Sequence, residues 1–176
     1  MTKVQAYLSW LFSLALLAIT AGQSWQSFEV SASAGGGVIG VSGFLAFPVI
    51  GTLISLQVVI ILTSLLVKPI ITRILAGAVL PLVAWSFIDV LVNSPDRIQS
   101  TVMGALAEQT GVMEELATSE FLVSSSGGAF SGLFLVASAI NALLLAFIAL
   151  VALRNPAVKS TKTDSQLPED LWSSQN

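Results

Sequence analysis

Three polar side chains interrupt the long apolar segments of this sequence, and they are the residues best placed to do chemistry. Gln57 and Asn141 lie near the middle of two such segments, and Asp89 lies about one helical turn inside the end of another. If these segments cross a membrane, polar groups at such depths are costly, so each is a candidate for lining a solute path. The structural alternative is that Gln57 and Asn141 hydrogen-bond across helices, while Asp89 reaches the membrane surface.

Catalysis has little support in the sequence. The chain contains no His and no Cys, which removes the commonest general base, the commonest metal ligand and every thiol nucleophile. No pair of carboxylates lies at helical spacing inside an apolar segment, and the glycine run at 35–37 lacks the Lys-Ser/Thr pair of a phosphate-binding loop. We therefore expect a protein that is not an enzyme and that binds no cofactor or metal.

The composition indicates lipid as the solvent of most of this chain. Of 176 residues, 55% are apolar and only 10% are charged, and the mean hydropathy is +0.88. Soluble domains usually carry about 25% charged residues. The formal net charge of -3 argues against nucleic acid as a partner, because nucleic acid requires clustered Lys and Arg.

Four apolar segments are long enough, or nearly so, to cross a bilayer, whose hydrocarbon core requires about 20 helical residues. They cover approximately residues 5–22, 44–67, 70–92 and 129–153. The sequence therefore predicts an all-α membrane protein, with a four-transmembrane-helix bundle inside residues 1–156. The first segment also fits a cleaved signal peptide, although no clear cleavage site follows it. Pro69 suits a tight turn between the second and third spans, and Pro81 should kink the third.

The charged residues lie between the spans and are sorted by sign. The gaps before the first span, between the second and third spans and after the fourth contain Lys3, Lys68, Arg73, Arg154, Lys159 and Lys162. The other gaps are acidic, with Arg97 as their single basic residue. Because Lys and Arg near spans are retained on the cytoplasmic side, we predict a multi-pass plasma-membrane protein with both termini cytoplasmic. The polar tail, 157–176, is predicted to be disordered.

Two outer segments, 23–43 and 93–128, are expected to form a cap outside the cytoplasm. Alternating apolar residues on both sides of a glycine run predict a β-hairpin in the first: Phe28, Val30, Ile39 and Val41. Apolar residues at four-residue steps predict an amphipathic helix in the second: Ile98, Val102 and Leu106. The polar face of that helix is acidic, with Glu108, Glu114, Glu115 and Glu120. Such a face does not favour anionic lipids, so we expect it to be solvated or to face a partner protein.

Tryptophans and small residues give further expectations about the bundle. Trp10, Trp25 and Trp85 are predicted to be anchors at the membrane interfaces. Trp85 lies one turn before Asp89, so its indole N–H could point toward that carboxylate. Small residues that allow close helix packing occur in the fourth and second spans: Gly128, Gly132, Ser138, Ala142, Gly51 and Ser55. They favour either a bundle within this chain or a contact with another membrane protein or a second copy.

The order of these features along the chain resembles that of a known family. The first span is followed by Trp25 and a short alternating stretch that ends in VSG at 41–43. Pro48 marks the start of the second span, and a short basic link leads to ITRILAGAVLPLVAW at 71–85. A separated last span then ends in a basic tail. In these features the chain resembles the tryptophan-associated transmembrane proteins of actinobacteria.

That resemblance covers roughly residues 5–90 and, weakly, 129–155. It implies a small four-span membrane protein of a kind often encoded beside tryptophan biosynthesis genes and without an assigned activity. It carries over no catalytic residue, and the last span lacks the tryptophan expected near its outer start. Our leading hypothesis is a non-enzymatic accessory or scaffold subunit that acts through helix packing and the acidic outer cap. The alternative is a small-solute transporter or transport regulator, with a link to tryptophan metabolism coming only from the resemblance.

Overall fold

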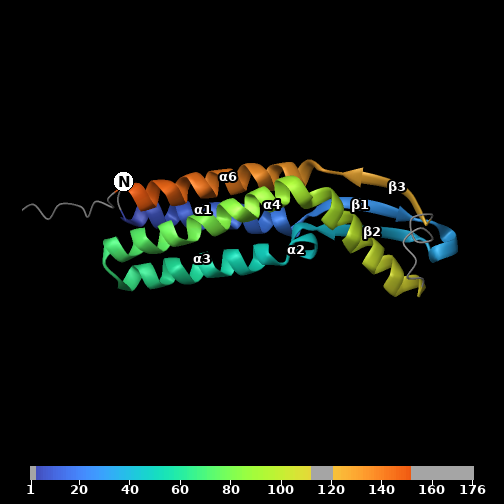
Figure 1. The fold of residues 1–176 in the computed structure, drawn as a ribbon, viewed down its shortest axis with the longest axis horizontal. Helices are drawn as coiled ribbons and strands as arrows, with labels where there is room; N and C mark the ends of the chain where they lie inside the picture. The colour runs from blue at the N-terminus through green and yellow to red at the C-terminus, as the bar shows by residue number, and fades with distance from the viewer. Residues whose placement is uncertain (1–2, 112–120, 152–176) are drawn as a thin grey trace, which may run out of the picture.

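The computed structural model describes residues 3–111 and 121–151, and in this part of the chain four long helices form one elongated bundle (Figure 1). The four helices are α1 (Lys3–Gly22), α3 (Val49–Leu66), α4 (Pro69–Thr110) and α6 (Ala129–Leu150). Each is long and apolar enough to cross a membrane. The expected four-span architecture therefore has a matching set of helices, and a small sheet extends from one end of the bundle (Figure 1).

The sheet forms a cap at one end of the bundle together with the second half of α4 (Figure 1). β1 (Ser24–Val30) and β2 (Gly37–Ser42) are antiparallel, which confirms the predicted hairpin. The turn between them contains the short 3-10 helix η1 (Ala32–Ala34) and then Gly35 and Gly36, which have positive φ, as does Gly37 at the start of β2. A third strand, β3 (Leu122–Gly127), pairs with the other side of β1, and this strand was not predicted. The described chain is therefore mostly helical but not all-α.

The helix α4 unites two elements that the sequence analysis separated. It runs continuously for 42 residues, through Pro81 and Pro95, from the turn after α3 to the left-handed Gly111. At 1.5 Å per residue it is about 63 Å long, roughly twice the thickness of a hydrocarbon core. The predicted third span and the predicted amphipathic helix are thus one helix, which changes direction where it leaves the bundle (Figure 1). The apolar residues predicted for the half of α4 in the cap are buried, namely Ile98, Val102 and Leu106.

The connections around α3 follow from local sequence. Pro69 occupies the first turn of α4, and Lys68 before it is extended, so the predicted tight turn is confirmed. At the other end, the predicted second span is shorter than expected, because α2 (Gly43–Ala46) forms a separate turn before it. Phe47 breaks the helix there and buries its ring, and α3 then begins after Pro48.

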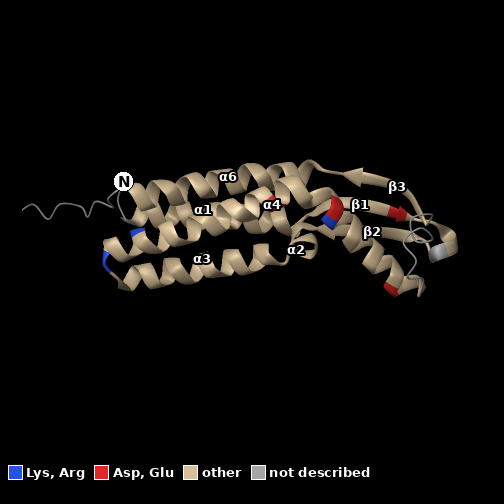
Figure 2. Cartoon of the chain, viewed as in Figure 1, with Lys and Arg blue, Asp and Glu red and all other residues tan. Residues whose placement is uncertain are grey.

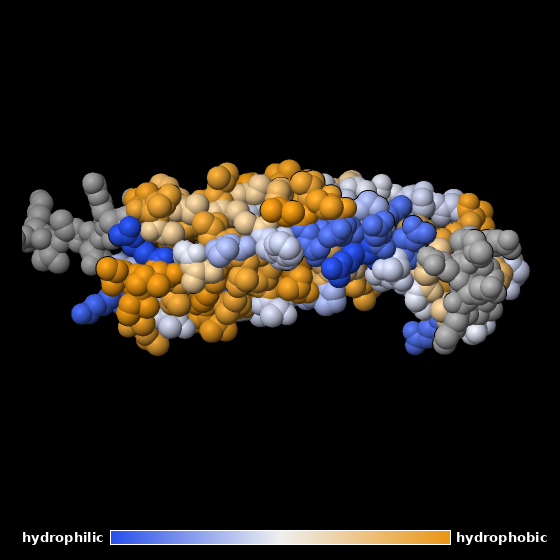
Figure 3. All heavy atoms as spheres, in the orientation of Figure 1, coloured by the Kyte–Doolittle hydropathy of each residue, from blue (hydrophilic) through white to orange (hydrophobic). Residues whose placement is uncertain are grey.

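The charged residues of the described part are separated along the molecule as predicted. Lys68 and Arg73 lie at the end of the bundle that holds the N-terminus, whereas Glu29 and Glu108 lie in the cap (Figure 2). The surface of the bundle is largely apolar in the view of Figure 3, and hydrophilic residues gather where α4 leaves it. Several predicted features lie outside the described residues: the basic Arg154, the tail 157–176 with Lys159 and Lys162, and the acidic Glu114, Glu115 and Glu120.

Candidate functional site

The first of the intramembrane polar residues, Gln57, is bonded to a tryptophan. The indole Nε1 of Trp10 donates to Gln57 Oε1 at 2.9 Å, and both side chains are fully buried between α1 and α3. The prediction that Trp10 anchors the chain at an interface is therefore wrong. A buried indole N–H needs an acceptor, and the amide oxygen supplies one inside the bundle.

Asn141 is bonded to the same helix and not to Gln57. Its Nδ2 donates to Ser13 Oγ at 2.9 Å, and that hydroxyl donates in turn to the carbonyl of Trp10 at 2.8 Å. The expected hydrogen bond between Gln57 and Asn141 is absent from the described residues. Each amide instead ties its helix to α1, which makes α1 the centre of the polar contacts. Asn141 Oδ1 is buried without a partner in the described part of the chain.

Further polar contacts close the end of the bundle that holds the N-terminus. The hydroxyl of Tyr7 donates to the carbonyl of Ser64 at 3.0 Å and lies 3.3 Å from Thr72 Oγ1, so it joins α1, α3 and α4. Arg73 Nε donates to the carbonyl of Ala149 at 3.0 Å, at the last turn of α6. A helix leaves its last carbonyls unpaired, so Arg73 stabilises this end in addition to its expected role in topology. Tyr7 was not among the predicted site residues, although a lone tyrosine at the end of an apolar span was a usable signal.

A small cavity lies at the centre of the bundle. Its volume is about 20 Å³, and its polar lining comes from three helices: Gln57 of α3, Ser86 of α4 and Ser138 of α6. A cavity of this size holds about one water molecule. The predicted packing residue Ser138 therefore lines a water-sized space, and the cavity is far too small to hold an organic solute.

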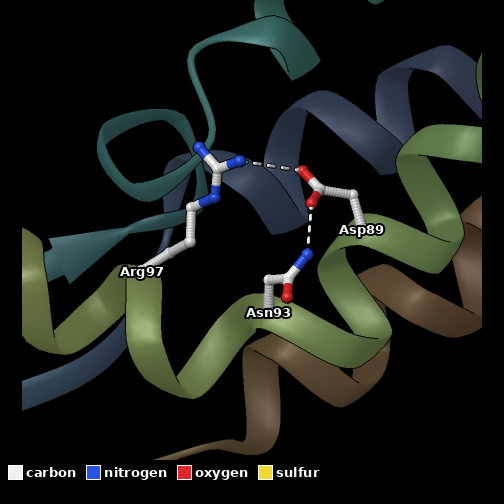
Figure 4. Close-up of polar contacts among 3 residues, drawn as sticks. All are labelled: Asp89, Asn93 and Arg97. Carbon is white, nitrogen blue, oxygen red and sulfur yellow. Dashed lines mark hydrogen bonds and ion pairs between the residues drawn. The ribbon is translucent and has the colours of Figure 1, made fainter.

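Asp89, the third of these polar candidates, belongs to a cluster at the end of the bundle next to the cap (Figure 4). Asn93 Nδ2 donates to Asp89 Oδ1 at 2.6 Å, and Arg97 Nη2 lies 3.6 Å from Asp89 Oδ2. All three residues lie on α4, at steps of four. The Asp89 side chain is 15% exposed and that of Arg97 is 50% exposed. The cluster therefore lies at the edge of the buried core and carries one charge of each sign.

Aromatic rings continue from this cluster into the core. The Arg97 guanidinium carbon lies 5.4 Å from the centre of the Phe47 ring, a distance typical of a cation–π contact. The Phe47 ring packs on Trp25 of β1 at 5.9 Å, and Trp25 packs on Phe134 of α6 at 5.1 Å. Trp25 is fully buried and its Nε1 donates to the carbonyl of Thr20, so the prediction that it is an interface anchor is also wrong. Trp25 thus joins the cap to α6 through the Phe134 ring and to α1 through the carbonyl of Thr20.

Of the three tryptophans predicted to be interface anchors, Trp85 has the surroundings that such an anchor requires. Its side chain is 73% exposed, in a stretch of α4 with other exposed apolar residues. No hydrogen bond joins its indole to Asp89 in the described structure, where that carboxylate is bonded to Asn93 and paired with Arg97. The predicted contact between Trp85 and Asp89 is therefore not formed.

The predicted packing residues divide into two groups. A Cβ at Gly51 would contact Phe44 at 3.8 Å, and Ala142 is partly buried, so both lie at contacts within the chain. By contrast, a Cβ at Gly128 or Gly132 would meet no described atom within 4 Å, and Ser55 is exposed. The glycine pair at the start of α6 thus makes no close helix contact inside the described chain.

Neither metal ligands nor relatives add to this picture. Among the described residues, no three His, Cys, Asp or Glu side chains are grouped as a metal ion would require. No protein-family model, no curated protein and no solved structure matches this chain. Similarity to the tryptophan-associated transmembrane proteins therefore stays a hypothesis based on sequence features.

Proposed function

We propose that this protein is a non-enzymatic accessory or scaffold subunit of the membrane. The observation that carries the proposal is the use of the buried polar side chains. Gln57 and Asn141 are both bonded to α1, and the cavity beside Gln57 holds about one water molecule. Polar groups inside a membrane are costly and usually serve either transport or helix association. Here their hydrogen bonds join helices of this chain to one another, which favours a structural role for these side chains over a solute path.

The fixed attachment of the cap supports the same proposal. Trp25 and Phe47 are fully buried where the cap meets the bundle, and Arg97 covers the Phe47 ring. A binding surface that is held rigidly by packed rings loses little conformational entropy when it meets a partner. The cap therefore suits a role as a stationary platform for another protein.

The start of α6 offers a second contact surface, inside the membrane. Gly128 and Gly132 are exposed, with no described atom near their missing Cβ positions, and Val136, one helical turn after Gly132, is exposed on the same face. Small residues let a partner helix approach closely where lipid tails supply no hydrophobic drive for association. We propose that a helix of the partner protein packs on this face.

A substitution on this face tests the proposal. We expect Gly132→Leu to release a stoichiometric membrane partner that co-purifies with the wild-type protein in mild detergent. Gly104→Leu is the matched control, because Gly104 is also helical and exposed with open space around it, but lies in the outer half of α4. Finding only monomers or homo-oligomers of the wild-type protein in several detergents would contradict the proposal.

The alternative, transport of a small solute or its regulation, has less support from the geometry. A path along Gln57 and Asn141 would have to break the bonds that tie α3 and α6 to α1. Transport would predict that Asp89→Asn abolishes a solute-dependent phenotype. Retained activity in that variant, and in Gln57→Ala combined with Asn141→Ala, would remove this alternative.

We also propose that both termini are cytoplasmic, on the basis of the basic residues near the N-terminal end of the bundle. An alkaline phosphatase reporter, which is active only outside the cytoplasm, should be inactive when fused after Arg154. The same reporter inserted at Gly36, in the turn between β1 and β2, should be active. The reverse pattern would invert the orientation and place the cap in the cytoplasm.

A further inference from the structure

We propose that the free edge of β3 binds an extended, basic segment of a partner protein as a fourth strand. This inference rests on the proposed accessory function, because it assigns a surface and a chemistry to the partner. Strand addition at a sheet edge uses backbone hydrogen bonds for affinity and alternate side chains for specificity. Such binding requires a strand edge that is unpaired, accessible and complementary in charge to the added strand.

The hydrogen bonds of the sheet identify the backbone groups of β3 that have no partner among the described residues. Gly128 N donates to the carbonyl of Trp25 at 2.7 Å, and Ser27 and Glu29 are paired with Ser126 and Ser124. In an antiparallel pair, alternate residues direct their backbone groups toward the neighbouring strand. Ser124 and Ser126 therefore face β1, whereas Ser125 and Gly127 direct their N–H and C=O groups away from it.

This edge is accessible along its length. Residues 123–127 are all exposed, and Val123 is 66% exposed. The opposite edge of the sheet differs, because β2 is in contact with both α4 and α2. Edge strands are commonly protected by Lys or Pro, but the sequence LVSSSG of β3 contains neither. The irregular pairing at Val123 limits the regular ladder to the segment 124–127, so the added strand would be short.

Charge identifies the chemistry of the partner segment. The two outer segments contain six acidic residues and one basic residue in the sequence. Glu29 lies on the strand next to β3, and Ser124 Oγ donates to Glu29 Oε2 at 2.8 Å. Strands lie about 4.8 Å apart, so a residue opposite Ser124 on the added strand would be two spacings from Glu29. The side chain of Lys or Arg can cover that distance above the small serine.

Symmetry excludes a second copy of this chain as the occupant. Two copies inserted in the same sense are related by a rotation about the membrane normal, and β3 runs roughly along the bundle axis (Figure 1). Such a rotation leaves the strand direction unchanged, so the two β3 strands would be parallel and level, with Ser125 beside Ser125. In a parallel ladder, a residue forms hydrogen bonds with the two residues that precede and follow the residue directly opposite it. Opposite Ser125 these would be Ser124 and Ser126, whose backbone groups face β1, so the hydrogen bonds would not form.

Defined peptides test this proposal with the full-length protein in lipid nanodiscs. The probe is a short, fluorescently labelled peptide of alternating Val and Lys, and binding is followed by anisotropy. We expect saturable binding of this peptide, and at least about tenfold weaker binding of two relatives. In one relative Glu replaces Lys, and in the other the edge-facing amides are N-methylated. Equal binding of all three peptides, or no binding of the basic one, would overturn the proposal.

Two variants locate the binding site. Glu29→Gln should weaken binding of the basic peptide by about two- to fivefold, as expected for an exposed charge pair. Glu108→Gln, which neutralises an exposed acid elsewhere in the cap, should leave it unchanged. Equal effects of the two variants would mean that the peptide senses only the overall charge, which would also overturn the site. The wild-type protein could fail to bind the basic peptide and yet co-purify with a membrane partner that Gly132→Leu releases. That result would refute the edge site and leave the accessory function intact.

Discussion

Asp89 and Arg97 form an ion pair that spans Pro95 within the single helix α4. Their charged atoms lie 3.6 Å apart, although eight residues separate them along the chain. In a straight helix, that separation corresponds to about 12 Å along the axis, well beyond the usual four-residue pair. Proline removes one helical hydrogen bond and favours a bend, and the long arginine side chain covers the remaining distance. The pair therefore connects the bundle half of α4 to its cap half.

Removing this connection should loosen the cap. In Arg97→Met, we expect backbone amide hydrogen exchange to become faster over the cap half of α4, around Val102, while α3 is unchanged. The increase should reach about fivefold at most, because a half-exposed ion pair contributes about 1 kcal/mol or less. Glu108→Gln, an exposed charge change on the same half of α4, serves as the control. Unchanged exchange in Arg97→Met would show that the aromatic contacts alone hold the cap.

The Trp10–Gln57 hydrogen bond should contribute to the stability of the bundle. In Gln57→Leu the buried indole N–H loses its acceptor, so we expect a loss of about 1 to 2 kcal/mol in the free energy of unfolding. Trp10→Phe in the same background should cost less than it does in the wild-type protein, because no donor is then left unpaired. A double-mutant cycle measured by unfolding in mixed micelles gives the coupling. Additive effects of the two substitutions would contradict a direct bond.

Asn141→Leu should cost less than Gln57→Leu, although both residues are buried amides. Asn141 Oδ1 has no partner in the described structure, so the substitution removes an unpaired acceptor together with a hydrogen bond. Ser13 also keeps its bond to the carbonyl of Trp10 when Asn141 is absent. The comparison uses the same unfolding measurement for both variants. A larger cost for Asn141→Leu would indicate that its free oxygen is satisfied by a water molecule in the bundle.

The helix α4 illustrates how much of the fold could be predicted from the sequence. The four-residue spacing of Ile98, Val102 and Leu106 predicted the buried face of the cap helix correctly. The continuity of this helix with the third span was not predicted, because the polar residues around Pro95 are typical of a membrane boundary and a loop. Strand β3 was missed because its serines lack alternation, and it is ordered by pairing with β1.

The polar residues of the site could be predicted from their residue types, but their hydrogen-bond partners could not. Gln57 and Asn141 stood out as polar residues in apolar segments, and both are indeed buried. Their partners Trp10 and Ser13 were not recognised, since a tryptophan near the end of a span is typical of an interface. Whether such a ring faces lipid or the bundle depends on the rotation of α1, which packs against both α3 and α6. Periodicity could not determine that rotation, because this helix is apolar on most sides.

The close approach of Gly43 to Trp25 gives the last prediction. A Cβ at Gly43 would lie 2.6 Å from Cε2 of the Trp25 ring and 3.1 Å from the Cα of Ala21. The ring is fully buried and packed between Phe47 and Phe134, so it has no space into which it could move. We therefore expect Gly43→Ala to lower the free energy of unfolding by about 1 to 3 kcal/mol, as overpacking of a core does.

Gly77→Ala is the matched control for this substitution. Its Cβ would meet Ala149 Cβ at 3.7 Å, an ordinary contact between α4 and α6. Since alanine is favoured over glycine inside a helix by about 0.5 to 1 kcal/mol, this variant should be neutral or slightly more stable. Both variants are compared by thermal unfolding in the same detergent, with tryptophan fluorescence as the signal. An unchanged midpoint in Gly43→Ala would mean that the junction between cap and bundle is loose, and the cap could then not act as a rigid platform.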